Sequence, residues 1–199
     1  MQPVITTIDL LRHGEVEGGA CYRGTTDDPL TELGWQQMRT AVAGRDDWQL
    51  IISSPLCRCL NFGKELGRQK QLSLITETGF QELHFGDWEG KTAEQIEPDA
   101  LRRFYEDPVN YPPPNGESLP VLEQRLEVAW QRILQNQAGK SILIVTHAGV
   151  IRTLLCLLLK VPLEKSFTIQ VDHASFTRFS CFHAEDGDFI QLNYHNRLK

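Results

Sequence analysis

Three largely apolar runs in this chain each end in an arginine or histidine cluster, and a helical pattern follows each run. They cover residues 4–11, 51–52 and 142–145. Strands that alternate with helices predict a mostly parallel sheet. The carboxyl ends of parallel strands meet at one edge, where open α/β sheets bind ligands. The sequence therefore predicts an α/β fold with one site at that edge.

The residues at these strand ends are suited to holding a phosphoryl group. Arg12 and His13 follow the first run. Arg58 lies in the first turn of the helix after the second run, and His147 follows the third. A neutral imidazole can attack phosphorus, and a guanidinium can hold two phosphate oxygens at once. We interpret this cluster as a site for phosphoryl transfer through a phosphohistidine.

Four motifs occur in order along the chain, at residues 12–14, 53–58, 82–90 and 146–149. Together they resemble the histidine phosphatase superfamily, the group of phosphoglycerate mutases and acid phosphatases. The resemblance covers nearly the whole chain. It implies a three-layer αβα fold of the phosphoglycerate mutase type, with a mostly parallel central sheet and an antiparallel edge strand. It also implies one domain over residues 1–199, with an insertion covering the site at roughly 92–117.

By this resemblance His13 is the nucleophile, and Arg12, Arg58 and His147 surround the transferred phosphoryl group. Two guanidiniums and a protonated His147 would stabilise the negative charge on the phosphoryl oxygens. His13 must instead be neutral to attack. We therefore expect its other ring nitrogen to donate to a backbone carbonyl or a similar acceptor.

Further cationic and N–H groups are expected around the same site. The backbone N–H groups of Ala148 and Gly149 begin the helix after the third run and can bind an anion. Arg23 and Arg152 can join the two arginines already named in a local positive well. Such a well is compatible with the formal net charge of −6.

One carboxyl group should protonate the leaving oxygen and then activate water. We favour Glu82, because the proton donor of the family precedes a Leu-x-x-Gly pattern like the one here. Glu89, seven residues further on, is the competing carboxylate.

Other phosphate chemistries lack their motifs. No arginine lies six positions after any of the five cysteines, as a cysteine phosphatase requires. The glycines of the first loop are not followed by the Lys-Ser or Lys-Thr of a P-loop. The six histidines show no paired metal-ligand spacing. We therefore expect no cofactor and no metal.

Composition narrows the class of partner. A net charge of −6 argues against nucleic acid and acidic membranes, which leaves a small-molecule phosphate ester. The N-terminal apolar segment carries Asp9 and resembles neither a signal peptide nor a membrane span. Five cysteines without a Cys-x-x-Cys pair predict a reduced, cytoplasmic protein. Cys57 and Cys59 are read either as small buried fillers or as redox-sensitive thiols.

The remaining chain shows the expected helix and strand patterns. A helix capped by Thr31 should extend to about Gly44, and another should start at Ser118. Residues 107–117 hold prolines that predict a loop. Phe104, Tyr105 and Tyr111 either contact the substrate from a lid or pack under the insertion. Strands are predicted at residues 166–171, 175–180 and 189–194.

The segment at residues 21–31 resembles the branch of the family that hydrolyses α-ribazole 5′-phosphate in cobalamin nucleotide-loop assembly. This resemblance places Tyr22 at the substrate and predicts that ester as the substrate. Arg23 is an insertion relative to the branch pattern, and a Trp-Asn found in many relatives is absent. Arg23 either replaces the missing phosphate contact or is an ordinary solvated loop arginine.

Three alternatives to that function stay open. The first is a broad-specificity or sugar-phosphate phosphatase, and the second is a phosphoglycerate mutase. The third is not an enzyme but a phosphoprotein-binding regulatory domain that keeps the pocket. Substrate, oligomeric state and lid motion are not specified by the sequence.

Overall fold

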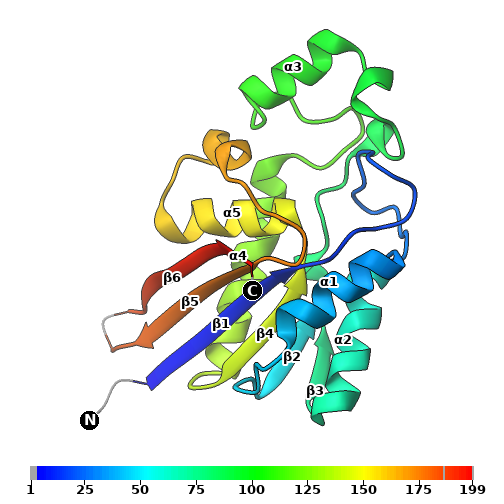
Figure 1. Ribbon diagram of the computed structural model, residues 1–199. Helices are drawn as coiled ribbons and strands as arrows, with labels where there is room; N and C mark the ends of the chain where they lie inside the picture. Colours follow the sequence, from blue (N-terminus) through cyan, green and yellow to red (C-terminus); the bar gives the residue numbers. More distant parts are fainter. Residues whose placement is uncertain (1–3, 186, 199) are drawn as a thin grey trace.

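Six strands form one sheet at the centre of the protein, for which the computed structural model describes residues 4–185 and 187–198 (Figure 1). The order across the sheet is β3-β2-β4-β1-β5-β6. The strands are β1 (Val4–Arg12), β2 (Leu50–Ser53), β3 (Ser73–Thr76), β4 (Ser141–Thr146), β5 (Phe176–His183) and β6 (Phe189–Arg197). The first four are parallel, whereas β5 is antiparallel to both of its neighbours. The predicted mostly parallel sheet with an antiparallel element on one side is confirmed.

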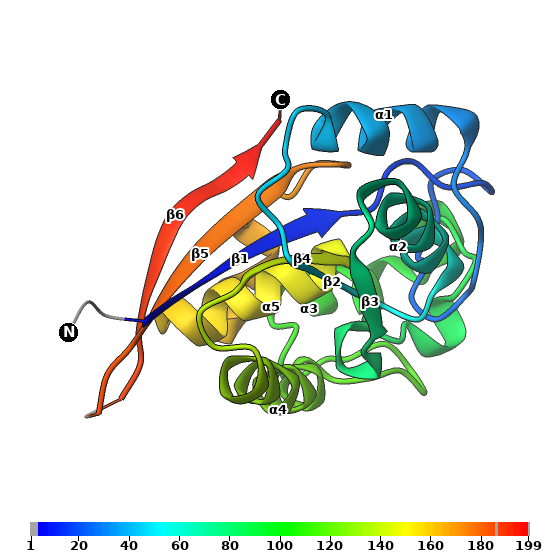
Figure 2. The same ribbon diagram turned by 90° about the horizontal axis from the view of Figure 1, so that it is seen from below.

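Helices cover both faces of the sheet and complete the three expected layers (Figure 2). Alternate residues of each strand point to opposite faces. On one face Leu11 and Ile51 pack against α1 and α2, and on the other Ile8 and Leu10 pack against α4 and α5. The helices are α1 (Glu32–Val42), α2 (Cys57–Lys70), α3 (Pro98–Glu106), α4 (Leu119–Asn136) and α5 (Ala148–Leu159). Four 3-10 helices lie in the connections: η1 (Thr78–Phe80), η2 (Gly86–Trp88), η3 (Ala93–Gln95) and η4 (Leu163–Thr168).

Two helix starts were predicted correctly. The Thr31 hydroxyl accepts a hydrogen bond from the N–H of Gly34 at 2.9 Å and caps α1. That helix ends at Val42, two residues before the expected end, because Ala43 is extended. Ser118 precedes α4, as expected, and one face of this helix is buried.

The strand predicted at residues 166–171 is wrong. This segment forms the end of η4 and an irregular stretch after it. Its apolar side chains do become partly or fully buried, but they pack against helices. Both edges of β1 are already paired, with β4 and β5, so this segment cannot pair with β1.

A buried carboxylate on β1 ties the two antiparallel strands to the rest of the sheet. Asp9 is fully buried and accepts hydrogen bonds from Trp48 Nε1 at 2.8 Å and from Tyr194 Oη at 3.0 Å. The Arg178 guanidinium adds two more, at 2.8 and 2.6 Å. Four donors to one buried carboxylate offset the cost of removing its charge from water.

Replacing Asp9 with asparagine should lower the free energy of unfolding by about 3 kcal/mol, because the substitution leaves a partly buried guanidinium without its counter-charge. Urea unfolding followed by tryptophan fluorescence measures the change. Asp47→Asn is the matched control, since the half-exposed Asp47 contacts the same guanidinium at 3.1 Å. That variant should lose no more than about 0.5 kcal/mol. Equal losses in the two variants would contradict the role given to Asp9.

Candidate active site

Adjacent parallel strands bring the predicted site residues together. The neighbours β2, β4 and β1 end in register, with Ser53 paired to Val145 and Arg12 paired to Thr146. His13 directly follows β1 and His147 directly follows β4, and their ring centroids lie 5.2 Å apart. A cavity of about 730 Å³ opens at this edge, lined by Arg12, His13, Arg58, Glu82 and Arg152 among others.

His13 is fixed in the tautomer that nucleophilic attack requires. Its Nδ1 lies 2.7 Å from the carbonyl oxygen of Gly14, so Nδ1 carries the proton and Nε2 has a free lone pair. Burial, and then the charges of Arg58 and Arg12, hold the pKa of His13 well below its usual value. The backbone acceptor expected from the sequence is thus the carbonyl of Gly14, the next residue.

His147 is neutral, which corrects the expected protonated state. Its Nδ1 accepts from Arg58 Nε at 3.3 Å, so the ring proton is on Nε2, which donates to the Ser54 hydroxyl at 2.7 Å. Complete burial and the neighbouring Arg58 lower the pKa of His147 well below its ordinary value. A second positive charge here would be unfavourable beside the guanidinium.

Backbone carbonyls, rather than carboxylates, hold the two arginines. Arg58 is buried and donates to the carbonyls of Gly24 and Thr26, both at 2.7 Å. Arg12 donates to the carbonyl of Val171 at 2.6 Å, while its buried Nε has no partner among the described residues. Burial lowers the pKa of Arg12 to about 10, so it remains charged at neutral pH. Both guanidiniums keep N–H groups for an anion.

Glu82 is held at the cavity by two backbone N–H groups. Its Oε1 accepts from Leu83 at 3.0 Å and its Oε2 accepts from Gly149 at 3.2 Å. The predicted anion-binding N–H of Gly149 is therefore occupied by this carboxylate. A Cβ on Gly149 would lie 2.5 Å from Glu82 Oε1, so only glycine allows the approach. Ala148 is buried at the first position of α5.

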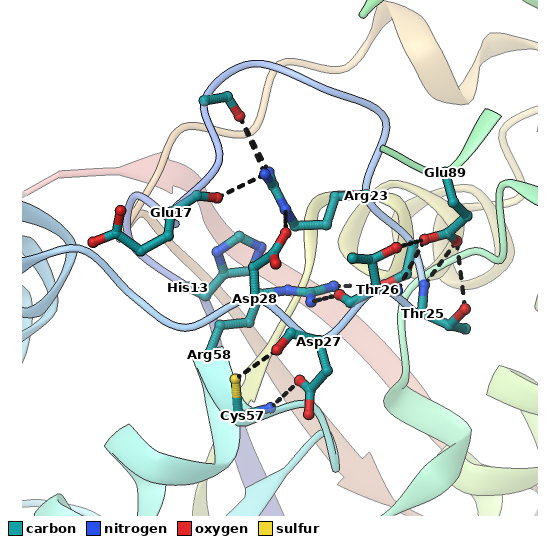
Figure 3. A network of polar contacts seen from close by, with 12 residues as sticks. His13, Glu17, Arg23, Thr25, Thr26, Asp27, Asp28, Cys57, Arg58 and Glu89 are labelled. Atoms are coloured by element: carbon teal, nitrogen blue, oxygen red, sulfur yellow. Dashed lines mark hydrogen bonds and ion pairs between the residues drawn. The ribbon is translucent and has the colours of Figure 1, made fainter. Parts of the chain in front are cut away.

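Glu89, the competing carboxylate, binds the first loop, the segment at residues 13–31 between β1 and α1 (Figure 3). It accepts from the N–H groups of Thr25 and Thr26 at 2.9 Å and of Phe85 at 3.0 Å. Burial by itself would raise the pKa of Glu89, but these hydrogen bonds and one from the Thr26 hydroxyl lower it below its usual value. Both of its oxygens are thus taken up by loop groups.

Arg23 is not the solvated loop arginine that was one of its two expected roles, and its contact with phosphate stays a prediction. Figure 3 shows its guanidinium turned toward its own loop, where it contacts Asp28 at 2.5 Å and the carbonyl of Glu17 at 2.7 Å. Its side chain is 8% exposed, so it is not a solvated surface arginine. Arg23 borders the cavity, but its guanidinium forms hydrogen bonds within residues 17–28.

Aromatic side chains form the mouth of the cavity. The hydroxyls of Tyr22 and Tyr105 lie 2.8 Å apart and join the first loop to α3. Phe85 and Phe167 line the same cavity. Of the three aromatic residues expected near a lid, Tyr105 borders the cavity, and Phe104 is buried beneath it. Tyr111 is exposed and stacks on Arg103.

The sequence analysis missed His173. Its ring centroid lies 5.8 Å from that of His13, and burial lowers its pKa to about 4. It sits in the irregular turn before β5, where the N–H of Ala174 donates to the carbonyl of His13 at 3.3 Å. No motif surrounds this histidine, so only the topology reveals it.

All five cysteines are free thiols. Burial raises the pKa of Cys57 to about 11 and also raises that of Cys59. Both are therefore protonated at neutral pH, which supports their interpretation as fillers.

Two further findings concern only the described part of the chain. No cluster of three or more histidine, cysteine or acidic side chains there is placed to hold a metal ion. None of the helices between residues 4 and 198 is long and apolar enough to span a membrane.

Comparisons with known proteins agree with this geometry. Residues 8–194 match the family model described as histidine phosphatase superfamily, branch 1. A bifunctional protein of Mycobacterium tuberculosis is 30% identical over 195 residues, which cover 94% of this chain but 53% of the relative. The chain thus spans about half the length of that relative. Phosphoserine phosphatase 1 of Hydrogenobacter thermophilus is 29% identical over 184 residues, covering 89% of this chain and 86% of the relative.

Solved structures give the same result. Mycobacterial glucosyl-3-phosphoglycerate phosphatase superposes with a TM-score of 0.85 at 28% identity, covering 97% of this chain and 99% of the other. An Escherichia coli protein provisionally described as an alpha-ribazole-5′-P phosphatase superposes with a TM-score of 0.80 at 24% identity, covering 98% of each chain. At that identity the likeness concerns the fold alone.

Acid should destabilise the folded protein from pH 6.5 downward. Below this value the unfolded histidines take up protons that buried His13 and His147 do not, because their folded-state pKa values are lowered. Stability is therefore complete above pH 6.5 and is lost as pH falls, by up to about 1.4 kcal/mol per pH unit for each buried histidine.

Urea unfolding at intervals between pH 7 and pH 5 measures this slope. In the His13→Gln variant, the free energy of unfolding should fall less steeply with pH, because one of the two buried histidines no longer contributes. An identical slope in this variant and the parent would show that His13 titrates normally in the folded protein.

Proposed function

This chain belongs to branch 1 of the histidine phosphatase superfamily, and from that premise we propose that it is a phosphomonoesterase that works through a phosphohistidine at His13. The observation that carries the proposal is the contact of 2.7 Å between His13 Nδ1 and the carbonyl of Gly14. It leaves Nε2 as an unprotonated nucleophile in a cavity that Arg12 and Arg58 line, among other residues.

In the first half of the reaction, His13 Nε2 attacks phosphorus and the bond from phosphorus to the ester oxygen breaks. Arg12 and Arg58 offset the charge that spreads over the phosphoryl oxygens. His147 supports this arrangement as a neutral partner of Arg58 and Ser54. Protonated Glu82 gives its proton to the leaving alkoxide, so a neutral alcohol departs.

In the second half, the Glu82 carboxylate takes a proton from a water molecule as that water attacks the phosphohistidine. The bond from phosphorus to nitrogen breaks, inorganic phosphate leaves, and His13 returns to its neutral state. One carboxyl group can serve both halves because it ends the first as a base. The amides of Leu83 and Gly149 keep it in place throughout.

For the substrate, we propose α-ribazole 5′-phosphate, with a broad-specificity or sugar-phosphate phosphatase as the alternative. The resemblance of residues 21–31 supports the first, as do the rings of Tyr22, Phe85, Tyr105 and Phe167, on which a planar base can stack. A mutase would have to return the phosphoryl group to its product, and a purely phosphoprotein-binding domain would not need the acid.

A specific observation favours a second candidate substrate, the phosphate ester of an alcohol that also carries a carboxylate. Arg152 lines the cavity. Its Nε donates a hydrogen bond to the carbonyl of Ile169 at 2.8 Å. The planar end of its guanidinium is suited to a carboxylate. The similarity to phosphatases of phosphoserine and glucosyl-3-phosphoglycerate is consistent with this class.

We further propose that the protein acts on a small molecule in the cytoplasm and not on nucleic acid. The five free thiols and the net charge of −6 support this setting. We expect a reaction that needs no metal.

Replacing Glu82 with glutamine should slow phosphorylation of His13 by an alkyl phosphate about 100- to 1,000-fold. The loss with 4-nitrophenyl phosphate should be much smaller, because nitrophenolate leaves without a proton. The first turnover of each ester, followed by rapid quench, measures the two rates.

Two variants serve as references for that experiment. His13→Ala should release no product from either ester. Glu89→Gln should slow the reactions of both esters by the same factor, because Glu89 binds a loop and transfers no proton. If Glu82→Gln kept the full rate with the alkyl ester, the assignment of the acid would be wrong.

A substrate panel measured in chelator should separate the proposed substrates. It compares α-ribazole 5′-phosphate with phosphoserine, 3-phosphoglycerate, sugar phosphates and an aryl phosphate. We expect kcat/KM for the ribazole ester to exceed the others by a hundredfold, or about 2.7 kcal/mol of differential transition-state binding. A preference for the acidic esters that Arg152→Gln removes would instead establish the second candidate. Equal rates across the panel would indicate broad specificity.

A further inference from the structure

Most of the segment that carries Glu82 has no regular secondary structure. Residues 79–84, here named the acid segment, begin within η1 and end before η2. Neither the sheet nor a long helix fixes its backbone. A general acid must nevertheless be placed within about 0.5 Å of its working position. The acid segment therefore depends on contacts from outside itself.

A partly buried ion pair supplies several of these contacts. The Arg125 guanidinium from α4 donates to the carbonyl of Gly79 at 2.7 Å and to the carbonyl of Glu82 itself at 3.1 Å. The same guanidinium forms a bidentate pair with Glu117, at 2.7 and 2.8 Å. Glu117 in turn holds His84, whose N–H approaches Oε2 at 3.4 Å and whose carbonyl accepts from the Glu117 N–H at 2.8 Å.

This pair thus forms hydrogen bonds with the acid segment at its start, at Glu82 and at its end. Its two side chains are partly buried, with 26% of Arg125 and 13% of Glu117 exposed. A guanidinium fork fixes direction as well as distance, which a lysine ammonium does not. The pair lies outside the cavity that holds His13, and neither member lines it.

Resting on the proposed function, we propose that Arg125 and Glu117 are positioning residues that set the orientation of Glu82 for proton transfer. They touch neither the substrate nor the phosphoryl group. Their loss would displace the carboxylate but leave Arg12, Arg58 and His13 in place, since those residues follow other strands. A displacement of about 1 Å in a reacting group costs on the order of 100-fold in rate.

The test uses Arg125→Lys in the full chain, because lysine keeps the charge and loses the fork. We expect phosphorylation of His13 by an alkyl phosphate to fall 10- to 100-fold, with a loss of less than threefold for 4-nitrophenyl phosphate. The inhibition constant of vanadate should stay within twofold of the parent value. Titration of active sites by the aryl ester corrects each rate for any unfolded fraction.

Glu117→Gln is the second variant, because it removes the ion pair but keeps an oxygen for the N–H of His84. It should show the same dependence on leaving group. Arg39→Lys is the matched control: Arg39 on α1 forms a bidentate pair with Glu65, at 2.9 and 3.1 Å, and contacts no residue of the acid segment. The control should match the parent with both esters.

The outcomes separate this inference from the function on which it rests. If Arg125→Lys and Glu117→Gln slow both esters equally after correction for active sites, the pair only stabilises the fold and the inference is wrong. If Glu82→Gln itself shows no dependence on leaving group, the assignment of the acid fails first. A leaving-group effect in Glu82→Gln that both positioning variants reproduce supports the two together.

Discussion

The parallel alignment of β2, β4 and β1 is the constraint on which the rest of the structure depends. Because these strands are neighbours and end in register, three segments far apart in sequence place Arg12, His13, Arg58 and His147 around one point. Hydrophobic packing on both faces of the sheet keeps the strand ends there. The site is therefore a consequence of the core, and its cationic groups need no loop closure to meet. The buried Asp9 network extends the same rigidity to β5 and β6.

The electrostatic design follows from the choice of partners. Backbone carbonyls hold Arg12 and Arg58, so their positive charge is oriented but not neutralised. Backbone N–H groups of Leu83 and Gly149 hold the Glu82 carboxylate in place at the cavity. Burial keeps both histidines neutral beside the guanidiniums. A chain with a net charge of −6 thus contains a cavity suited to a phosphate dianion.

Much of this could be predicted from the sequence, because strand ends and short motifs are local features. The placement of His13, Arg12 and Arg58 at strand ends and the cap of α1 depend on neighbours in the chain, whereas the sequence did not identify Gly14 as the acceptor for His13. The neutral state of His147 and the engagement of Gly149 by Glu82 depend on contacts between distant segments. The strand expected at residues 166–171 failed for the same reason, since only the topology shows that β1 has no free edge. Arg125 and Glu117 showed no chemical motif, and their contact with the acid segment appears only in the fold.

The central claim is that phosphate passes through His13, and the most direct test is to trap it there. The protein would be mixed with a ³²P-labelled aryl phosphate and quenched in alkali within the first turnover, and the labelled peptide would be identified. We predict a phosphoryl group that is stable to alkali and labile to acid, located on the peptide that contains His13 and absent from His13→Ala. Release of the alcohol without any protein-bound phosphate, or label on another residue, would contradict the account.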